Sequence, residues 1–177
     1  MPPLDPQAAK SCLPPVARAD ARLLILGSLP GEASLRAERY YAHPRNQFWR
    51  LLELVLEEPV EALGYENRLA VLQRRGIALW DTVASARRQG SLDGAMRGIA
   101  ANPLGKLIGG LRELQAVAFN GGTAARIGRR ALGTTHLDLI DLPSSSPALT
   151  LPFADKAERW AVLRRHVIDR AASRPEG

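Results

Sequence analysis

Short apolar runs alternate along this chain with segments in which apolar residues recur every three or four positions. The runs near residues 22–27 and 115–119 are nearly continuous, and they end at glycine or at Asn-Gly. Such runs are typical of strands that helices cover on both faces of a sheet. The pattern predicts, in chain order, strand 22–27, helix 47–57, helix 60–74, strand 77–80, helix 103–112, strand 115–119, helix 122–132, strand 136–142 and helix 155–172.

The first predicted helix has the most regular apolar stripe in the chain. Its apolar residues fall at positions i, i+3, i+4, i+7 and i+8, which share one face of a helix. They are Phe48, Leu51, Leu52, Val55 and Leu56. We therefore expect this face to pack against the core.

Strands that alternate with helices favour an α/β fold, because a parallel connection within a sheet needs a crossover segment. We expect a three-layer α/β/α sandwich around a central, mostly parallel sheet of about four strands. The loops that follow the carboxyl ends of such strands meet at one edge of the sheet. The turns after Leu26, Trp80, Phe119 and Leu142 should therefore converge on one cleft.

The length of 177 residues and the hydrophobic content of 46% suit a single domain over residues 1–177. The Pro-rich segment 1–20 and the end 173–177 are expected to be frayed. Neither a signal-peptide core nor a run long enough to span a membrane is present. Cys12 is the only cysteine, so the chain alone can build neither a disulfide nor a cysteine-ligated metal site. We expect a soluble, cytoplasmic monomer.

The chain is basic, with a formal net charge of +6 and a pI of about 10.2. This balance favours a polyanionic partner such as nucleic acid. Lys10, Lys106 and Lys156 are the only lysines, and arginine supplies the rest of the 24 basic residues. Arginine makes bidentate phosphate contacts, although such a bias can also reflect the codon composition of a genome.

A glycine turn, Gly27-Ser28-Leu29-Pro30-Gly31, follows the first predicted strand. Its backbone amides could bind a carbonyl oxygen or a developing anion, because glycine lets a backbone approach a ligand closely. The alternative is an ordinary turn from strand to loop. The chain has neither a phosphate-binding P-loop nor a dinucleotide fingerprint, so no nucleotide cofactor is expected.

Aromatic and polar residues gather just before the first amphipathic helix: Tyr40, Tyr41, His43, Arg45 and Asn46. Aromatic rings beside fixed polar groups suit a pocket that holds a flat ring. Neighbouring residues of an extended segment point in opposite directions, so one tyrosine should pack and the other should face the cleft. The histidine could instead be structural, and the asparagine could simply cap the helix.

A stiff loop with the serines Ser144, Ser145 and Ser146 between two prolines follows the last predicted strand. Its hydroxyls and amides could hold a phosphodiester, and Arg45 could contribute a charge. A plain surface turn is the alternative. A serine nucleophile is less favoured, because no Gly-x-Ser-x-Gly elbow is present.

Asp81 and Asn120 also end predicted strands on the side of the expected cleft. The plain alternatives are that Asp81 caps a following helix and that Asn120 turns the chain. The three histidines, His43, His136 and His166, are dispersed, and no carboxylates cluster in the sequence. No metal site is therefore expected.

Five motifs together resemble the DNA-deoxyinosine (hypoxanthine-DNA) glycosylase branch of the uracil-DNA glycosylase superfamily, over nearly the whole chain. They are Gly27–Gly31, Tyr40–Trp49, Ile77–Asp81, Phe119–Gly121 and Leu142–Pro147. The resemblance implies a uracil-DNA glycosylase-like fold and no cofactor. It also implies an enzyme that flips a deaminated base out of DNA and hydrolyses its N-glycosidic bond. Hypoxanthine is the favoured base, with uracil or xanthine as further possibilities.

The first motifs also look like those of the mismatch-specific uracil-DNA glycosylases. By this resemblance Tyr41 stacks on the extruded base, while Ser28 replaces the asparagine that positions water in those enzymes. Asn46 then becomes the substitute catalytic residue. Ser144 replaces the asparagine of the second motif, and Ala148 replaces the usual wedge leucine. These departures weaken the case for uracil.

The resemblance assigns the remaining site residues to two groups. Gly27, Leu29, Pro30 and His43 would contact the base, and the serine loop with Arg45 would contact DNA. Three other functions remain open. They are a glycosylase that acts mainly on uracil, a nucleic-acid-binding domain without catalysis, and a serine hydrolase that uses Ser28 or Ser145.

Overall fold

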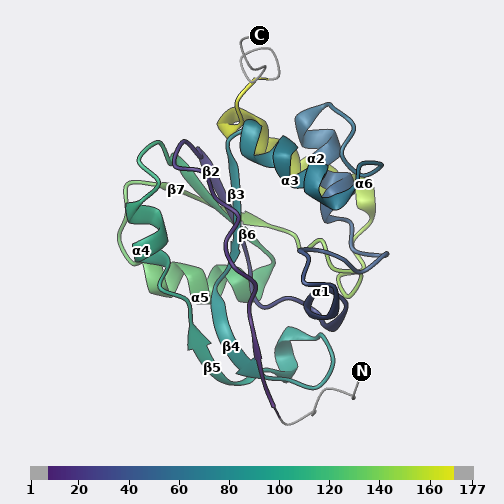
Figure 1. Ribbon diagram of the computed structural model, residues 1–177, viewed down its shortest axis with the longest axis vertical. Coiled ribbons are helices and arrows are strands. Elements are labelled where there is room, and N and C mark those ends of the chain that lie inside the picture. The colour runs from purple at the N-terminus through teal and green to yellow at the C-terminus, as the bar shows by residue number, and fades with distance from the viewer. Residues whose placement is uncertain (1–7, 170–177) are drawn as a thin grey trace.

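A parallel four-stranded sheet forms the centre of the molecule (Figure 1). The computed structural model describes residues 8–169. The order of the strands is β3-β2-β6-β7, and every neighbouring pair is parallel. The strands are β2 (Leu23–Gly27), β3 (Ile77–Asp81), β6 (Ala116–Asn120) and β7 (Asp138–Leu142).

Helices cover both faces of this sheet, as Figure 1 shows. One layer consists of α2 (Phe48–Leu56), α3 (Tyr65–Arg74) and α6 (Phe153–Trp160), and the other of α4 (Leu104–Gly109) and α5 (Gly122–Leu132). Leu23 and Ile25 of β2 pack toward the first layer, whereas Leu24 and Leu26 pack toward the second. All four leave no surface exposed. The expected three-layer α/β/α sandwich is confirmed. The strands β2, β3 and β6 are almost entirely apolar because both of their faces are covered, whereas β7, at the edge of the sheet, is partly exposed and carries two aspartates.

The helix α2 follows its predicted stripe closely. All five residues of the stripe are buried, and Phe48, Leu51 and Leu52 have no exposed surface. The ring of Phe48 also contacts Trp160 of α6 edge to face, with ring centroids 5.8 Å apart. This contact joins two helices of the same layer.

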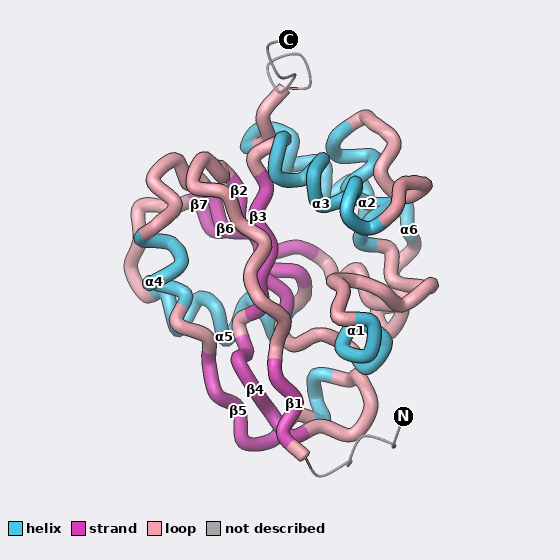
Figure 2. The backbone as a smooth tube through the Cα atoms, in the orientation of Figure 1, coloured by secondary structure: helices cyan, strands magenta, loops and turns pink. Residues whose placement is uncertain are grey.

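A second sheet of three antiparallel strands, which the sequence pattern did not predict, lies beside the sandwich (Figures 1 and 2). Its strands, in the order in which they pair, are β1 (Ala9–Ser11), β4 (Val83–Arg87) and β5 (Arg97–Ala101). Every residue of β5 is exposed, and the register between β4 and β5 shifts twice. Neither β4 nor β5 therefore shows the alternation of apolar and polar residues by which a strand is recognised in a sequence. Two further short elements were not predicted, α1 (Glu32–Ala37) and the 3-10 helix η1 (Asp93–Ala95).

The expectation that segment 1–20 is frayed is wrong for its described part, residues 8–20. β1 pairs with β4, and Val16 exchanges two backbone hydrogen bonds with Leu79 of β3. Lys10 is 8% exposed and forms an ion pair with Glu32 at 2.9 Å. These contacts hold the segment although its sequence is rich in proline. Residues 1–7 and 173–177 lie outside the described residues.

Two predicted helices have different bounds in the structure. The helix predicted over 60–74 begins only at Tyr65, because Arg68 donates side-chain hydrogen bonds to the carbonyls of Glu61 and Leu63. Because these carbonyls already accept hydrogen bonds from Arg68 in a turn, residues 60–64 do not join the helix.

The helix predicted over 155–172 is replaced by α6 and the 3-10 helix η2 (Ala161–His166). Beyond it, Ile168 exchanges hydrogen bonds with the backbone and side chain of Arg75, which holds the chain out of the helix. Residues 170–172 lie outside the described residues.

A close contact between α5 and β6 gives the first prediction. A Cβ on Gly128 would overlap the ring of Phe119 and lie 3.2 Å from Cγ2 of Thr82. We expect Gly128→Ala to lower the free energy of unfolding by about 1–3 kcal/mol, the usual cost of overpacking a core. Urea denaturation measures this change. Gly122→Ala in the same helix is the control, since a Cβ there meets nothing within 4 Å. Equal stability of the two variants would contradict the prediction.

Candidate functional site

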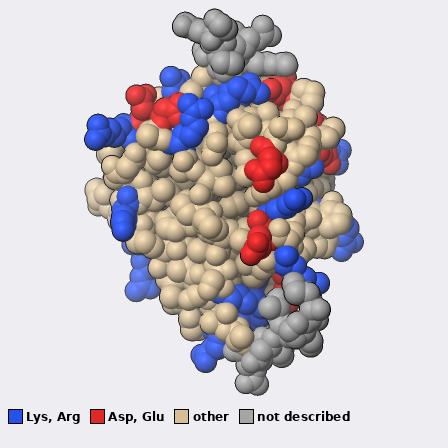
Figure 3. Space-filling model, viewed as in Figure 1, with Lys and Arg blue, Asp and Glu red and all other residues tan. Residues whose placement is uncertain are grey.

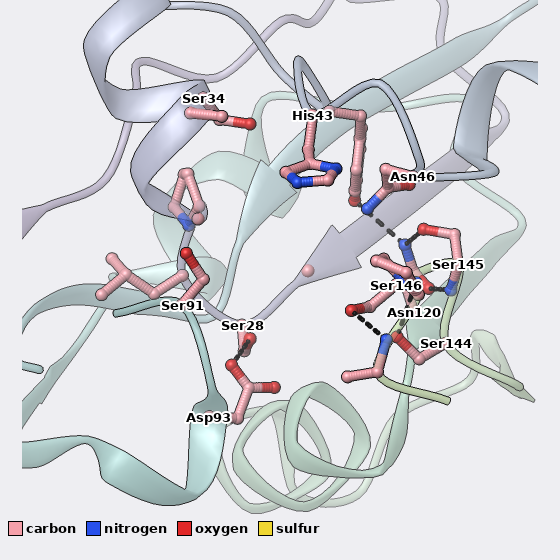
Figure 4. A pocket seen from close by; sticks show the side chains of 18 of the residues that line it. Ser28, Ser34, His43, Asn46, Ser91, Asp93, Asn120, Ser144, Ser145 and Ser146 are labelled. Carbon is pink, nitrogen blue, oxygen red and sulfur yellow. Dashed lines mark hydrogen bonds between the residues drawn. The ribbon is translucent and has the colours of Figure 1, made fainter. Parts of the chain in front are cut away.

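A cavity of about 620 Å³ opens at the carboxyl ends of β2, β3 and β6 (Figure 4). The cleft that the strand order implied is thus present. All of the site residues expected from the sequence line it, namely Gly27, Ser28, Leu29, Pro30, Tyr41, His43, Arg45, Asn46, Ser144, Ser145 and Ser146. Asp81, Asn120 and Ala148 line it as well, together with Ser91, Leu92 and Asp93, which the sequence did not single out.

The backbone of the glycine turn presents its N–H groups on one side. The carbonyls of Gly27 and Ser28 accept hydrogen bonds from the backbone N–H groups of Thr82 and Val83, at 2.8 and 3.0 Å. In a planar trans peptide the next N–H points the opposite way. The N–H groups of Ser28 and Leu29 therefore point away from β3 and β4, and no hydrogen bond among the described residues occupies them.

Arg88 fixes the second half of the same turn. Its guanidinium, on a residue that is 1% exposed, donates to the carbonyls of Leu29 and Pro30 and, at 2.9 Å, to that of Gly90. By the same peptide geometry the N–H of Gly31 faces away from Arg88. The turn thus offers several unpaired N–H groups at the cavity, an arrangement that binds anions. The sequence did not indicate Arg88, because its partners in the glycine turn, Leu29 and Pro30, lie more than fifty residues away in the chain.

Glycine at position 27 lets two side chains approach the backbone closely. A Cβ there would lie 2.6 Å from Oδ1 of Asp81 and 3.2 Å from Oη of Tyr41. The first distance is too short for any real Cβ. The missing side chain leaves the Asp81 carboxyl and the Tyr41 hydroxyl next to the turn.

Asp81 is a buried carboxyl at the edge of this cavity. It is 3% exposed, and its Oδ2 has no hydrogen-bond partner among the described residues. Burial raises the pKa of Asp81 well above its usual range, and the nearby charge of Asp93 raises it further, whereas that of Arg88 lowers it. The sequence placed Asp81 on the side of the expected cleft, with a helix cap as the plain alternative, and the Asp81 side chain caps no helix in the described structure.

Ser28 and Asp93 form a short hydrogen bond, 2.6 Å from Oγ to Oδ1 (Figure 4). Ser91, in the same segment, accepts a hydrogen bond from the N–H of Glu32 at 2.9 Å. The segment that precedes β5 therefore closes the wall of the cavity opposite the serine loop. Because the Ser28 hydroxyl donates to a carboxylate and not to a histidine, Ser28 gives no support to a serine hydrolase.

Tyr40 and Tyr41 point in different directions, as expected. Tyr40 is 4% exposed, and its hydroxyl donates to the carbonyl of Pro14 at 2.7 Å. The Tyr41 ring lines the cavity and stacks on Phe48, with centroids 3.7 Å apart and planes inclined by 12°. Tyr41 has a φ of 53°, an uncommon conformation for a non-glycine residue. This backbone turn and the amide of Asn120, which donates to the Tyr41 hydroxyl at 3.3 Å, hold the ring in place.

Asn120 ties the serine loop to the end of β6. Its Nδ2 donates to Oγ of Ser145 and its Oδ1 accepts from the N–H of Ser145, both at 2.9 Å (Figure 4). The carbonyl of Ser145 in turn accepts from the N–H of Gln47 at 3.0 Å. Asn120 thus does more than turn the chain. Ser145 is 1% exposed and paired with an amide, so it too gives no support to a serine hydrolase.

The other two serines bond within the loop. Ser144 Oγ accepts from the N–H of Ser146 at 3.1 Å, and Ser146 Oγ accepts from the N–H of Ala148 at 3.2 Å. Lys156 of α6, 1% exposed, donates to the carbonyl of Ser146 at 3.2 Å. Burial lowers the pKa of Lys156. A basic group thus lies directly behind the serine loop.

Asn46 and His43 both bond to nearby backbone. Asn46 Oδ1 accepts from the N–H of Phe48 at 3.0 Å, although the N-cap position itself is Gln47. His43 Nδ1 accepts from the N–H of Arg45 at 3.1 Å, which places the proton of the neutral ring on Nε2. Each side chain therefore keeps a donor nitrogen for the cavity, Nδ2 of the asparagine and Nε2 of the histidine (Figure 4).

Within residues 8–169, no group of three or more His, Cys, Asp or Glu side chains could hold a metal ion. Nor does any helix there have the length and apolar content needed to cross a membrane.

The fold and the cavity define an α/β protein with a ligand site at the carboxyl edge of a parallel sheet. Residues 14–164 match the family model described as Uracil DNA glycosylase superfamily, and the chain belongs to this superfamily. The resemblance found in the sequence is confirmed.

Similar proteins come from species of Methanosarcina. A protein of Methanosarcina barkeri named Hypoxanthine DNA glycosylase is 40% identical over 112 residues, which cover 63% of this chain and 71% of the relative. One of the same name from Methanosarcina acetivorans is 32% identical over 157 residues, 89% of this chain and 99% of the relative. A solution NMR structure from Methanosarcina acetivorans, described as a candidate uracil DNA glycosylase, has a TM-score of 0.79 at 32% identity. The match covers 90% of this chain and 98% of the chain in that structure.

The buried carboxyl of Asp81 predicts a stability change with a defined dependence on pH. Because its folded pKa is raised, the stability it contributes is full below the unfolded pKa and is lost as pH rises through the folded pKa. Asp81→Asn removes this loss. The free energy of unfolding of the variant should therefore rise relative to that of the wild type as the pH increases above about 4, the ordinary pKa of aspartate.

Chemical denaturation across this range measures the difference. Glu61→Gln, at an exposed carboxylate, is the control and should show a constant offset. A constant offset for Asp81→Asn as well would contradict the raised pKa.

Proposed function

We propose that this protein is a monofunctional DNA glycosylase that flips a deaminated base, above all hypoxanthine, out of DNA. It hydrolyses the N-glycosidic bond and leaves an abasic site, as a monomer and without a metal or cofactor. The names of both curated relatives and the superfamily support this enzyme class and agree with the function expected from the sequence. The observation that carries the proposal is a fixed aromatic ring beside unpaired backbone N–H groups in one cavity.

The Tyr41 ring supplies a platform for the flipped base. Phe48 covers one face of this ring in a parallel stack, so the other face is the one that can receive a base. Stacking of a base on an aromatic side chain contributes about 1–3 kcal/mol. Base flipping itself costs a few kcal/mol, and less at a mispair, which adds selectivity for damaged sites.

The glycine turn supplies donors where negative charge develops. Bond cleavage produces an oxocarbenium-like sugar and places negative charge on the departing base. The N–H groups of Ser28, Leu29 and Gly31 are fixed before the reaction by the bonds to their neighbouring carbonyls. Donors that need no rearrangement stabilise such charge most effectively.

Asn46 and Ser28 have distinct parts in this proposal. The Asn46 oxygen bonds to the start of α2, so the amide Nδ2 donates to the base. The Ser28 hydroxyl donates to Asp93, so only its lone pairs face the ligand. His43 Nε2 provides a further donor at the edge of the base.

The serine loop and Arg45 contact the DNA backbone. The Ser144–Ser146 loop is held by Asn120 and by α2, and the ammonium of Lys156 behind it favours a phosphate in front. Figure 3 shows lysine and arginine side chains around the margins of one face, with few charges at its centre. The net charge of +6 therefore attracts DNA over a long range rather than through one dense patch on that face.

A panel of labelled duplexes tests the function. Each duplex carries one hypoxanthine, uracil or xanthine, and alkali after incubation reveals abasic sites. We expect the fastest strand cleavage at hypoxanthine. Faster cleavage at uracil would establish a uracil glycosylase instead, and salt-dependent binding without any abasic product would establish a non-catalytic DNA-binding domain.

Two substitutions of Asn46 separate catalysis from helix capping. We expect Asn46→Ala to slow single-turnover release of hypoxanthine by about 10²-fold, the scale of losing one positioned donor. Asn46→Asp keeps an oxygen for the Phe48 N–H but loses the amide donor, so it should be equally slow and more stable than the alanine variant. If Asn46→Asp released hypoxanthine as fast as the wild type does, Asn46 would serve only to cap the helix.

A further inference from the structure

We propose that Asp81 is a further catalytic residue, which gives its carboxylic proton to a ring nitrogen of the departing purine. This inference rests on the proposed function and assigns a chemical step to a residue outside the set expected from the sequence. It also explains why a carboxyl is kept at a buried position where any apolar residue would cost less to bury.

The position of Asp81 meets the geometric requirement. Asp81 ends β3 directly opposite Gly27 in the parallel ladder, and it lines the cavity. Its Oδ1 lies 2.6 Å from the point that a Cβ on residue 27 would occupy. Glycine at position 27 thus leaves room for the carboxyl, which lines the cavity. Its Oδ2 has no hydrogen-bond partner among the described residues, so no protein group holds the proton.

The surroundings favour the protonated form of the carboxyl. Asp93 faces it from η1, Tyr40 and Tyr41 face it from the segment after α1, and Arg88 faces it from the segment after β4. Burial and the Asp93 charge raise the pKa of Asp81, and the Arg88 charge only partly opposes them. The pKa of each tyrosine is also raised, chiefly by burial, so neither phenol adds a charge near neutral pH. A neutral acid in a cavity can donate a proton that an exposed aspartate would already have lost.

The step balances in atoms and charge. The C1′–N9 bond breaks, and its electron pair stays with the purine. The proton of Asp81 moves to N3 or N7, so hypoxanthine leaves as a neutral molecule and Asp81 becomes a carboxylate facing the oxocarbenium-like sugar. Water then adds its oxygen to C1′, and its proton returns to the carboxylate. The sum is hydrolysis of one N-glycosidic bond.

This acid makes the site more selective for purines. Departing uracil spreads its charge onto the carbonyl oxygens of its ring, and the N–H groups of the glycine turn suffice to stabilise that anion. Hypoxanthine has unprotonated ring nitrogens that accept a proton. Loss of the acid should therefore slow release of hypoxanthine much more than release of uracil.

Single-turnover kinetics of wild type, Asp81→Asn and the control Glu61→Gln test the assignment. The duplexes carry 2′-deoxyinosine, its 7-deaza analogue or its 3-deaza analogue. Asparagine keeps the shape of the side chain but has no acidic proton. We expect Asp81→Asn to release hypoxanthine about 10²-fold more slowly, the scale of general acid catalysis. The wild-type rate should fall as pH rises through the pKa of the acid, and the variant should lose this dependence.

The analogues identify the acceptor nitrogen. The ratio of wild-type to variant rates should collapse to near unity on the analogue that lacks the acceptor, and stay high on the other. A variant as fast as wild type on deoxyinosine, or a ratio unchanged on both analogues, would overturn the assignment. Circular dichroism verifies folding. If the variant does not fold, the wild-type pH profile decides alone, and a flat profile counts against Asp81. Absence of any hypoxanthine release by wild type would instead refute the proposed function.

Discussion

The parallel pairing of β2 with β3 on one side and β6 on the other is the constraint on which the site depends. Its register sets Gly27 opposite Asp81 and Leu26 opposite Phe119, so three strands end at one level of the sheet. Polar groups that follow these strands therefore lie close together at this edge of the sheet. Asn120 lies one residue beyond the part of β6 that pairs with β2, and its side chain reaches both Tyr41 and the serine loop. The cavity is a result of strand register more than of any single loop.

Much of the fold could be predicted because its central elements are buried on both faces or amphipathic. The runs that form β2 and β6 contain little else than apolar residues, and α5 begins and ends at its predicted residues, 122–132. The antiparallel sheet was not predictable in this way. β5 is exposed along its whole length, so pairing with β4 and not burial makes it a strand. Pairing between distant segments leaves no periodicity in the sequence.

The site residues also divide into those that a local sequence motif predicts and those that only the fold brings together. Residues of the glycine turn, the tyrosine segment and the serine loop were recognisable because each is a compact local motif, and the family resemblance supplied their expected roles. Arg88 and Asp93 were not, since they act on Pro30 and Ser28 across 58 and 65 residues of chain. Asp81 was recognised as the end of one motif on the side of the cleft, but no role beyond a possible cap was assigned to it. Its burial and its contact with Gly27 depend on how β2 and β3 align, which composition and spacing do not encode.

The N-terminal segment has a consequence for the solubility of the protein. β3 is one of the two edge strands of the parallel sheet, and an uncovered edge strand can pair with another molecule and start aggregation. Val16 occupies part of its free edge through two backbone hydrogen bonds to Leu79. The neighbouring carbonyls of Leu13 and Pro14 accept from Trp80 and Tyr40. The same short segment thus shields the sheet from self-association and braces the tyrosine next to the cavity, so shortening the chain from this end would affect both.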